Sequence, residues 1–104
     1  MDEEVMPLGG NIELVGFRDV DPASMIVVKK MVGLYAKKLS ETTSAFEKLR
    51  VTLKKIHERE TSEKYELHSM MAAGGDTLTS EETSQNLFIA LDATLKKLEN
   101  QVGK

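Results

Sequence analysis

The C-terminal end of the chain has the most regular hydrophobic pattern in the sequence, from about Ser84 to Val102. Its apolar residues recur every three or four positions, which places them on one face of an α-helix. These residues are Phe88, Leu91, Leu95, Leu98 and Val102. Thr83 or Ser84 can cap the first turn by accepting a hydrogen bond from a free backbone amide. A helix with a single apolar stripe requires a partner surface, so the remainder of the chain must supply one.

That surface is predicted to be a β-sheet, because apolar and polar residues alternate in several segments, as they do in half-buried strands. The three clearest strands are predicted at 11–17, 48–57 and 64–71. A polar loop is expected at 58–63. Ala73-Gly74-Gly75-Asp76 contains residues that accept the positive φ angles of a tight hairpin. We therefore expect a fourth strand at 77–81.

A first helix is expected from Pro22 to about Leu39, with Asp21 as its N-cap. Its apolar stripe consists of Val28, Met31, Val32, Tyr35 and Leu39. The predicted fold is α+β with the order β-α-β-β-β-α, in which a mostly antiparallel four-stranded sheet carries both helices on one face. Residues 1–10 are acidic and contain Pro7 and Gly9-Gly10, so we expect a flexible tail before a single domain at 11–104.

The composition of the chain limits the classes of function that it can have. A chain of 104 residues provides one domain, and its formal net charge of −3 gives no overall attraction to nucleic acid or to an anionic membrane. Any RNA binding therefore needs local basic patches. The absence of cysteine excludes disulfides and thiolate chemistry. The acidic start does not resemble a signal peptide and no segment has the length and hydrophobicity of a membrane span, so we expect an unprocessed cytoplasmic protein.

No catalytic site is predicted, and no cofactor is expected. The carboxylate pairs Asp19/Asp21 and Glu81/Glu82 flank expected helix starts, where capping and the helix dipole account for them. The histidines, His57 and His68, lie on strands expected to be neighbours. That placement leaves two interpretations open, a shared metal site without an obvious third ligand or two ordinary surface histidines.

Basic residues form the remaining pattern. Lysine pairs occur on both expected helices, at 29–30, 37–38 and 96–97, and the second expected strand carries Arg50, Lys54 and Lys55. Lysines on solvated helix faces are common, but such residues also contact phosphates. If the helices pack side by side, their lysines approach one surface.

The order of elements and the end of the chain resemble the ribosome hibernation promoting factors, also called ribosome-associated translation inhibitors. The strongest match is 86–101, where Asn-Leu-Phe-Ile-Ala-Leu-Asp92 is followed by Lys-Lys-Leu-Glu-Asn-Gln101 after the Gly74-Gly75 hairpin. A looser match begins at Leu14-Val-Gly16-Phe-Arg18. The resemblance covers about 11–104, although the family's basic helical surface is thinner in this chain.

The resemblance implies a non-catalytic protein that binds rRNA of the small ribosomal subunit, where it inhibits translation or protects idle ribosomes under stress. The implied phosphate contacts are Arg18, Lys29, Lys30, Lys37, Lys38, Lys96 and Lys97. Ending at Lys104, the chain would correspond to a short form without the extension that pairs two ribosomes. The alternative is a protein-interaction module or homo-oligomer, suggested by Met70-Met71 and by apolar residues off the first helical stripe, Ile26, Val27 and Leu34.

Overall fold

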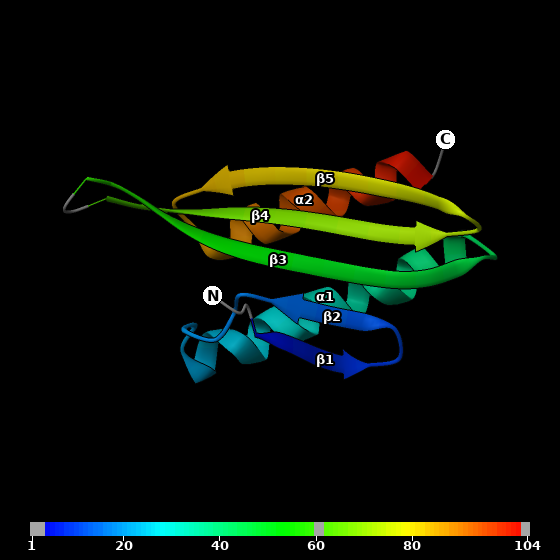
Figure 1. Ribbon diagram of the computed structural model, residues 1–104, viewed down its shortest axis with the longest axis horizontal. Coiled ribbons are helices and arrows are strands. Elements are labelled where there is room, and N and C mark those ends of the chain that lie inside the picture. Colours follow the sequence, from blue (N-terminus) through cyan, green and yellow to red (C-terminus); the bar gives the residue numbers. More distant parts are fainter. Residues whose placement is uncertain (1–3, 60–61, 103–104) are drawn as a thin grey trace.

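A five-stranded sheet with two helices forms the protein, which we describe from a computed structural model (Figure 1). The structure describes residues 4–59 and 62–102, with the side chains of 57–59, 62 and 63 left out. The elements, in chain order, are β1 (Val5–Gly9), β2 (Ile12–Val15), α1 (Pro22–Thr42), β3 (Phe46–Arg59), β4 (Ser62–Ala73), β5 (Asp76–Ser84) and α2 (Leu87–Val102).

The strands lie in the order β1-β2-β3-β4-β5. Every neighbouring pair is antiparallel except β2 and β3, which are parallel. A parallel pair needs a long crossover connection, and α1 provides it. Both helices lie behind the sheet in Figure 1, with α2 packed on β4 and β5 and α1 beside α2. Neither helix of the described residues covers the other face of the sheet.

The predicted four-stranded sheet and its β-α-β-β-β-α order are wrong, because Val5–Gly9 form an additional strand. This strand, β1, pairs with β2 at the edge of the sheet, where proline is tolerated, so Pro7 does not prevent it. Gly9 and Gly10 have φ values of 96° and 58°, which allow the chain to turn tightly into β2. The chain therefore follows the order β-β-α-β-β-β-α.

Several element boundaries also differ from those expected. Strands β3 and β4 extend through most of the predicted loop at 58–63, of which residues 60 and 61 lie outside the described part. Strand β5 is longer at both ends than 77–81, and α1 continues beyond Leu39. The cap of α2 is Asn86, whose Oδ1 accepts hydrogen bonds from the amides of Phe88 and Ile89 at 2.9 and 3.0 Å. Ser84 instead accepts a hydrogen bond from the Asn86 amide.

The core lies between the sheet and the two helices. The sheet contributes alternate residues of its strands, among them Leu14, Leu49, Val51, Leu67 and Met71. The helices contribute their apolar stripes, among them Val28, Val32, Leu39, Leu91, Leu95 and Leu98. Two buried hydroxyls, those of Ser69 and Thr94, lie 2.9 Å apart and hydrogen-bond across this layer. This bond satisfies polar groups that would be costly to bury alone.

Gly16 occupies a position that no other residue fits well. Its φ is 83°, and a Cβ there would overlap the backbone carbonyl oxygen of Leu53 on β3. The chain therefore passes close to β3 as it leaves β2. Neither α1 nor α2, the two helices of the described region, is long and apolar enough to cross a lipid bilayer.

Candidate nucleic-acid interface

Helix α1 carries four exposed lysines, more than any other element has among the described residues. Its buried residues, such as Val28 and Val32, face the sheet. At 100° per residue, Lys30 and Lys37 fall on nearly the opposite side, and Lys29 lies on the flank. All three lysines are exposed and form no hydrogen bond or ion pair with any residue that the structure describes. Their ammonium groups are therefore available to a partner.

The charge of α1 differs from that of the whole protein. The helix contains four lysines and one acid, Glu41, so its side chains sum to +3 in a chain of net charge −3. Negative charge is correspondingly concentrated elsewhere. A local basic surface of this kind attracts phosphate groups even when the protein as a whole is acidic.

Lys38 lies at the junction between the helices. Its Nζ is 5.1 Å from the centre of the Tyr35 ring, within the range of a cation–π contact. The Tyr35 hydroxyl donates a 2.7 Å hydrogen bond to Oδ1 of Asp92 on α2. Burial, and secondarily this bond to the carboxylate, raises the pKa of Tyr35 to about 12. Asp92 therefore ties α2 to α1 beside Lys38.

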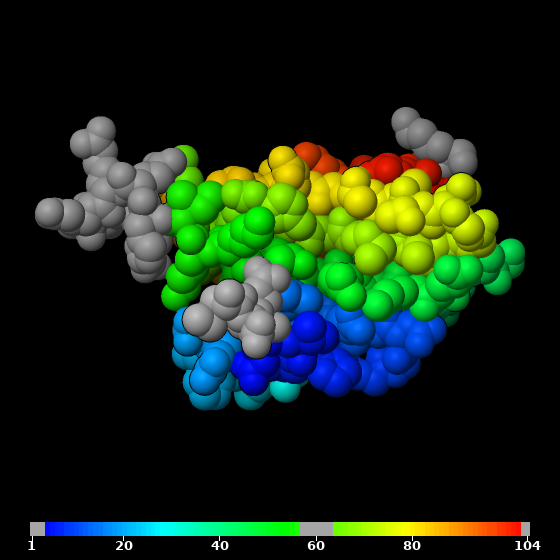
Figure 2. Space-filling model, in the orientation of Figure 1, coloured from blue at the N-terminus to red at the C-terminus, as the bar shows by residue number. Residues whose placement is uncertain are grey.

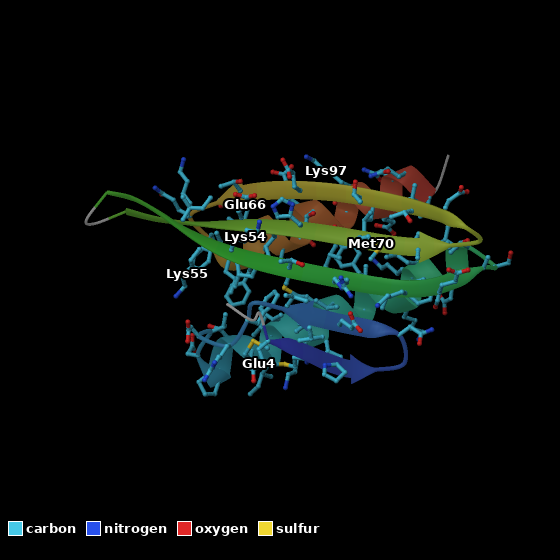
Figure 3. The ribbon with its side chains drawn as sticks, viewed as in Figure 1. Glu4, Lys54, Lys55, Glu66, Met70 and Lys97 are labelled. Atoms are coloured by element: carbon cyan, nitrogen blue, oxygen red, sulfur yellow. The ribbon has the colours of Figure 1, made fainter. Side chains whose placement is uncertain are left out.

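The two lysines of α2 have different surroundings. Lys96 projects away from the buried stripe, is exposed and contacts no described carboxylate. Lys97 lies by β5 (Figure 3), where its Nζ is 2.5 Å from Oε2 of Glu82 and 3.3 Å from the carbonyl oxygen of Glu81. The outward faces of the neighbouring helices thus carry Lys30, Lys37 and Lys96, whereas Lys97 is held against the sheet.

Arg18 lies apart from the helical lysines. It belongs to the connection between β2 and α1, and its Nε is 3.6 Å from Oε1 of Glu4. Both side chains are well exposed, so this ion pair adds little stability. Of the predicted phosphate contacts, Arg18 and Lys97 are the two whose charges are already paired with acids in the described structure.

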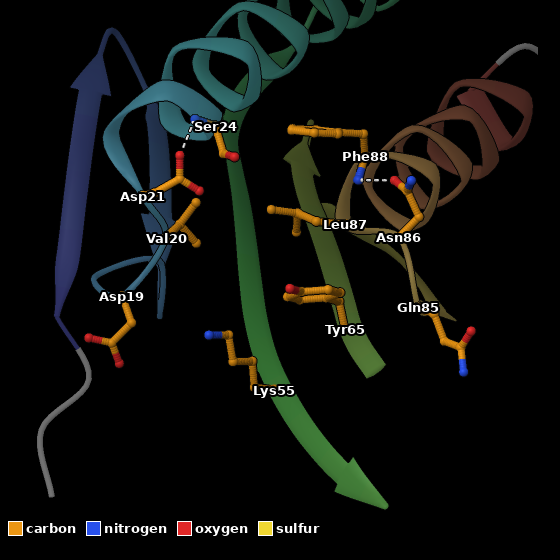
Figure 4. A pocket seen from close by; sticks show the side chains of 10 residues that line it. All are labelled: Asp19, Val20, Asp21, Ser24, Lys55, Tyr65, Gln85, Asn86, Leu87 and Phe88. Atoms are coloured by element: carbon orange, nitrogen blue, oxygen red, sulfur yellow. Dashed lines mark hydrogen bonds between the residues drawn. The ribbon is translucent and has the colours of Figure 1, made fainter. Parts of the chain in front are cut away.

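A cavity of about 250 Å³ opens where both helices begin (Figure 4). One side is formed by Asp21 and Ser24 at the start of α1, and the other by Phe88 at the start of α2. Lys55 of β3 and Tyr65 of β4 form part of its lining. The sequence analysis did not identify this cavity. The alternation in β3 could have indicated it, because Lys55 occupies the next inward position after Leu49, Val51 and Leu53, where a lysine needs access to solvent.

The uncovered face of the sheet, which faces the viewer in Figure 2, carries several charged side chains that form ion pairs with one another. Oε1 of Glu13 accepts a 3.0 Å hydrogen bond from Nε of Arg50 and lies 3.4 Å from Nζ of Lys48. These interactions, the bond from Arg50 first, lower the pKa of Glu13. The lysine and arginine of this group are therefore less available than those of α1.

Of the two interpretations left open for the histidines, a metal shared by His57 and His68 conflicts with the strand register. His68 pairs with Thr52, whereas His57 pairs with Glu63 five residues further along β3, a separation of about 16 Å. The side chain of His57 lies outside the described residues. His68 instead contacts Glu66 through Nε2, and its Nδ1 is 3.2 Å from Oε1 of Glu81.

Comparisons with known proteins agree with this architecture. Residues 26–104 match the family model described as sigma 54 modulation protein / S30EA ribosomal protein. The N-terminal domain of Protein Y from Thermus thermophilus is similar in structure, with a TM-score of 0.56 and 18% identity over 74% of this chain and 80% of that one. A ribosomal subunit interface protein from Coxiella burnetii gives a TM-score of 0.51 and 16% identity over 81% and 82%. No curated protein sequence matches the chain significantly.

Proposed function

Because this chain belongs to the family of sigma 54 modulation proteins and S30EA ribosomal proteins, we propose that it binds the ribosome and acts by occupying a site there. The proposal assigns it to rRNA of the small subunit. Binding at that site would inhibit translation or protect idle ribosomes, and would take place in the cytoplasm. The mechanism requires affinity and shape rather than bond-making chemistry.

The observation that carries the proposal is the unpaired charge on α1. Lys29, Lys30 and Lys37 are exposed and contact no carboxylate of the described residues. Lys96 of the neighbouring helix shares this property. Lysines that release counterions from phosphates supply most of the sequence-independent affinity of a protein for RNA. The outward side of the helical layer is therefore the surface that we assign to the phosphate backbone.

Cosedimentation with purified small and large ribosomal subunits tests this proposal. The protein is expected in the pellet with the small subunit at low salt, and its affinity should fall linearly on a log–log plot as salt rises. Protein that remains in the supernatant at low salt with both subunits would contradict ribosome binding. Equal sedimentation with the large subunit would contradict only the assignment to the small one.

A second candidate function rests on exposed apolar side chains. Ile26, Val27, Leu34 and Ile89 are between 42% and 68% exposed on the helices. Exposed apolar side chains mark a protein interface when they lie together in one patch. The alternative is therefore a protein-interaction module or a homo-oligomer. Light scattering that gives the mass of a monomer across a wide concentration range would exclude the homo-oligomer.

A further inference from the structure

The cavity at the start of the two helices exists because the strands extend further than the helices that cover them. On β3 the inward row of Leu49, Val51 and Leu53 continues to Lys55, and the register pairs Lys55 with Tyr65 of β4. At this level both helices are only beginning. The inward side of the sheet is therefore open to solvent at Lys55 and Tyr65, instead of being covered by a helix.

The wall of the cavity provides flat apolar surface. Tyr65 and Phe88 are both half-buried, and their rings point toward the space in front of Val20, together with Leu87 (Figure 4). Proteins bind unpaired RNA bases by packing them against such aromatic side chains. Stacked bases of a duplex cannot make this contact because both of their faces are occupied.

The rim provides hydrogen-bonding groups that the fold leaves unused. Lys55, Gln85 and the Tyr65 hydroxyl form no hydrogen bond or ion pair with any residue in the described part of the chain. Asn86 uses its Oδ1 to cap α2, which leaves its amide NH₂ group as a donor. Amide side chains and hydroxyls are the groups that recognise the exposed edge of a base.

The charges around the cavity limit what it can bind. Lys55 is the single lysine in the lining, whereas Asp19 and Asp21 are acidic. Asp21 is already engaged, since its Oδ2 accepts a 3.0 Å hydrogen bond from the Ser24 amide. One ammonium suits one phosphate, and the two carboxylates oppose a run of phosphates. Carboxylates do accept hydrogen bonds from the amino groups of bases.

We propose that this cavity receives one unpaired RNA nucleotide, with its base against Tyr65 and Phe88 and its phosphate at Lys55. The inference rests on the proposed function, since the lysines on the outward side of the helices would hold the adjoining RNA. The cavity would add a preference for single-stranded or bulged RNA to the general attraction of α1 for phosphate.

The test uses the full chain labelled with ¹⁵N and titrated with a single-stranded RNA of mixed sequence. The same RNA annealed to its complement and the four nucleoside 5′-monophosphates are the comparison ligands. We expect the side-chain amide signals of Gln85 and Asn86 to shift with the single strand at lower concentration than with the duplex or the monophosphates. Unmoved amides at saturating single strand would overturn the proposal, and so would equal affinity for a monophosphate, which would indicate a free nucleotide instead.

Matched substitutions in the cavity and on the opposite face of the sheet sharpen the test. Phe88→Leu is expected to weaken single-strand binding by about tenfold, because it removes an aromatic surface on which the base stacks. Lys55→Met is expected to weaken it by a similar factor, because it removes the ammonium that contacts the phosphate. Lys54→Met is the control, since Lys54 is the neighbour of Lys55 on β3 and its side chain faces the opposite side of the sheet. Equal losses of single-strand affinity from Lys54→Met and Lys55→Met would contradict the assignment of the RNA to the cavity. This comparison remains valid even if Phe88→Leu disturbs folding.

The outcome also separates this inference from the ribosome proposal. If the amides respond to single-stranded RNA but the protein fails to cosediment with ribosomes, the ribosome is the wrong partner and the cavity still binds RNA. If the protein cosediments and Lys55→Met has no effect in either assay, the ribosome proposal stands and the cavity proposal is wrong.

Discussion

The inward and outward faces of the helical layer differ sharply in burial and charge, even between residues only one or two positions apart in the chain. In α2, Leu95 is fully buried against the sheet, whereas the next residue, Lys96, is exposed. In α1, Val32 is buried and Lys30 is exposed with no described partner. The fold depends on the inward residues and makes no use of the outward charges. Residues that the fold does not need are the ones available to a binding partner.

The largest expected effect is on stability, from the inward face. Leu95→Ala should lower the free energy of unfolding by about 2–5 kcal/mol, because it removes a buried side chain and leaves a cavity. Lys96→Ala should change it by no more than about 0.5 kcal/mol. Urea denaturation of the two variants measures both values, and similar losses would contradict the division between the faces.

A smaller effect is expected where the two faces meet, at Tyr35. Tyr35→Phe removes the hydrogen bond to Asp92 and should cost about 0.5–1.5 kcal/mol at neutral pH. The folded-state pKa of about 12 is above the ordinary value near 10. The hydroxyl therefore stabilises the fold fully below pH 10, and this contribution is lost as pH rises through about 12.

Denaturation at several pH values between 9 and 12 checks this prediction. The wild-type protein should lose stability across the range by more than Tyr35→Phe does. Parallel curves for the two proteins would show that Tyr35 is not responsible for the alkaline loss.

The smallest effect is expected at the start of α1, where Asp21 caps the helix. Hydrogen bonds from Ser24, that from its backbone amide first, lower the pKa of Asp21. The carboxylate therefore stabilises the fold above its unfolded pKa, near 3.9, and the contribution disappears as pH falls through the folded value. Asp21→Ala should be less stable than the wild type at pH 7, and the difference should shrink as the pH falls below about 3.9. A difference that does not change with pH would point to packing instead of capping.

The parts of the fold that could be predicted are those with a long, regular pattern. The apolar stripe of α2 is found at Leu91, Leu95 and Leu98 as expected, and the family resemblance is confirmed by the match over 26–104. The missed strand β1 has only four residues before its turn glycine, and one of them is Pro7, a residue that argues against a strand in a sequence. Gly9-Gly10 was the available signal, because the same dipeptide correctly indicated the hairpin at Gly74-Gly75.

The candidate site was less predictable because it depends on tertiary placement. Lys30 and Lys37 can be assigned to the outward side of α1 from helical spacing alone. That Lys97 contacts Glu82 requires knowing where β5 lies beside α2. The cavity depends on how far the strands extend past the starts of the helices. It could not be predicted because the ends of helices and strands are the part of a fold that a sequence predicts least well.

The central claim is that the outward lysines of α1 bind ribosomal phosphates. The most direct measurement is cosedimentation with small subunits across a salt series, comparing two triple variants that each remove three positive charges. One is Lys29→Gln, Lys30→Gln and Lys37→Gln. The other, on the uncovered face of the sheet, is Lys48→Gln, Arg50→Gln and Lys54→Gln.

The helix variant should bind more weakly at low salt, with a log–log salt slope shallower by about 2 to 3 than that of the wild type. The sheet variant should keep most of the wild-type affinity and slope, although its net charge changes equally. An unchanged slope in the helix variant, or the same decrease in both variants, would contradict the claim.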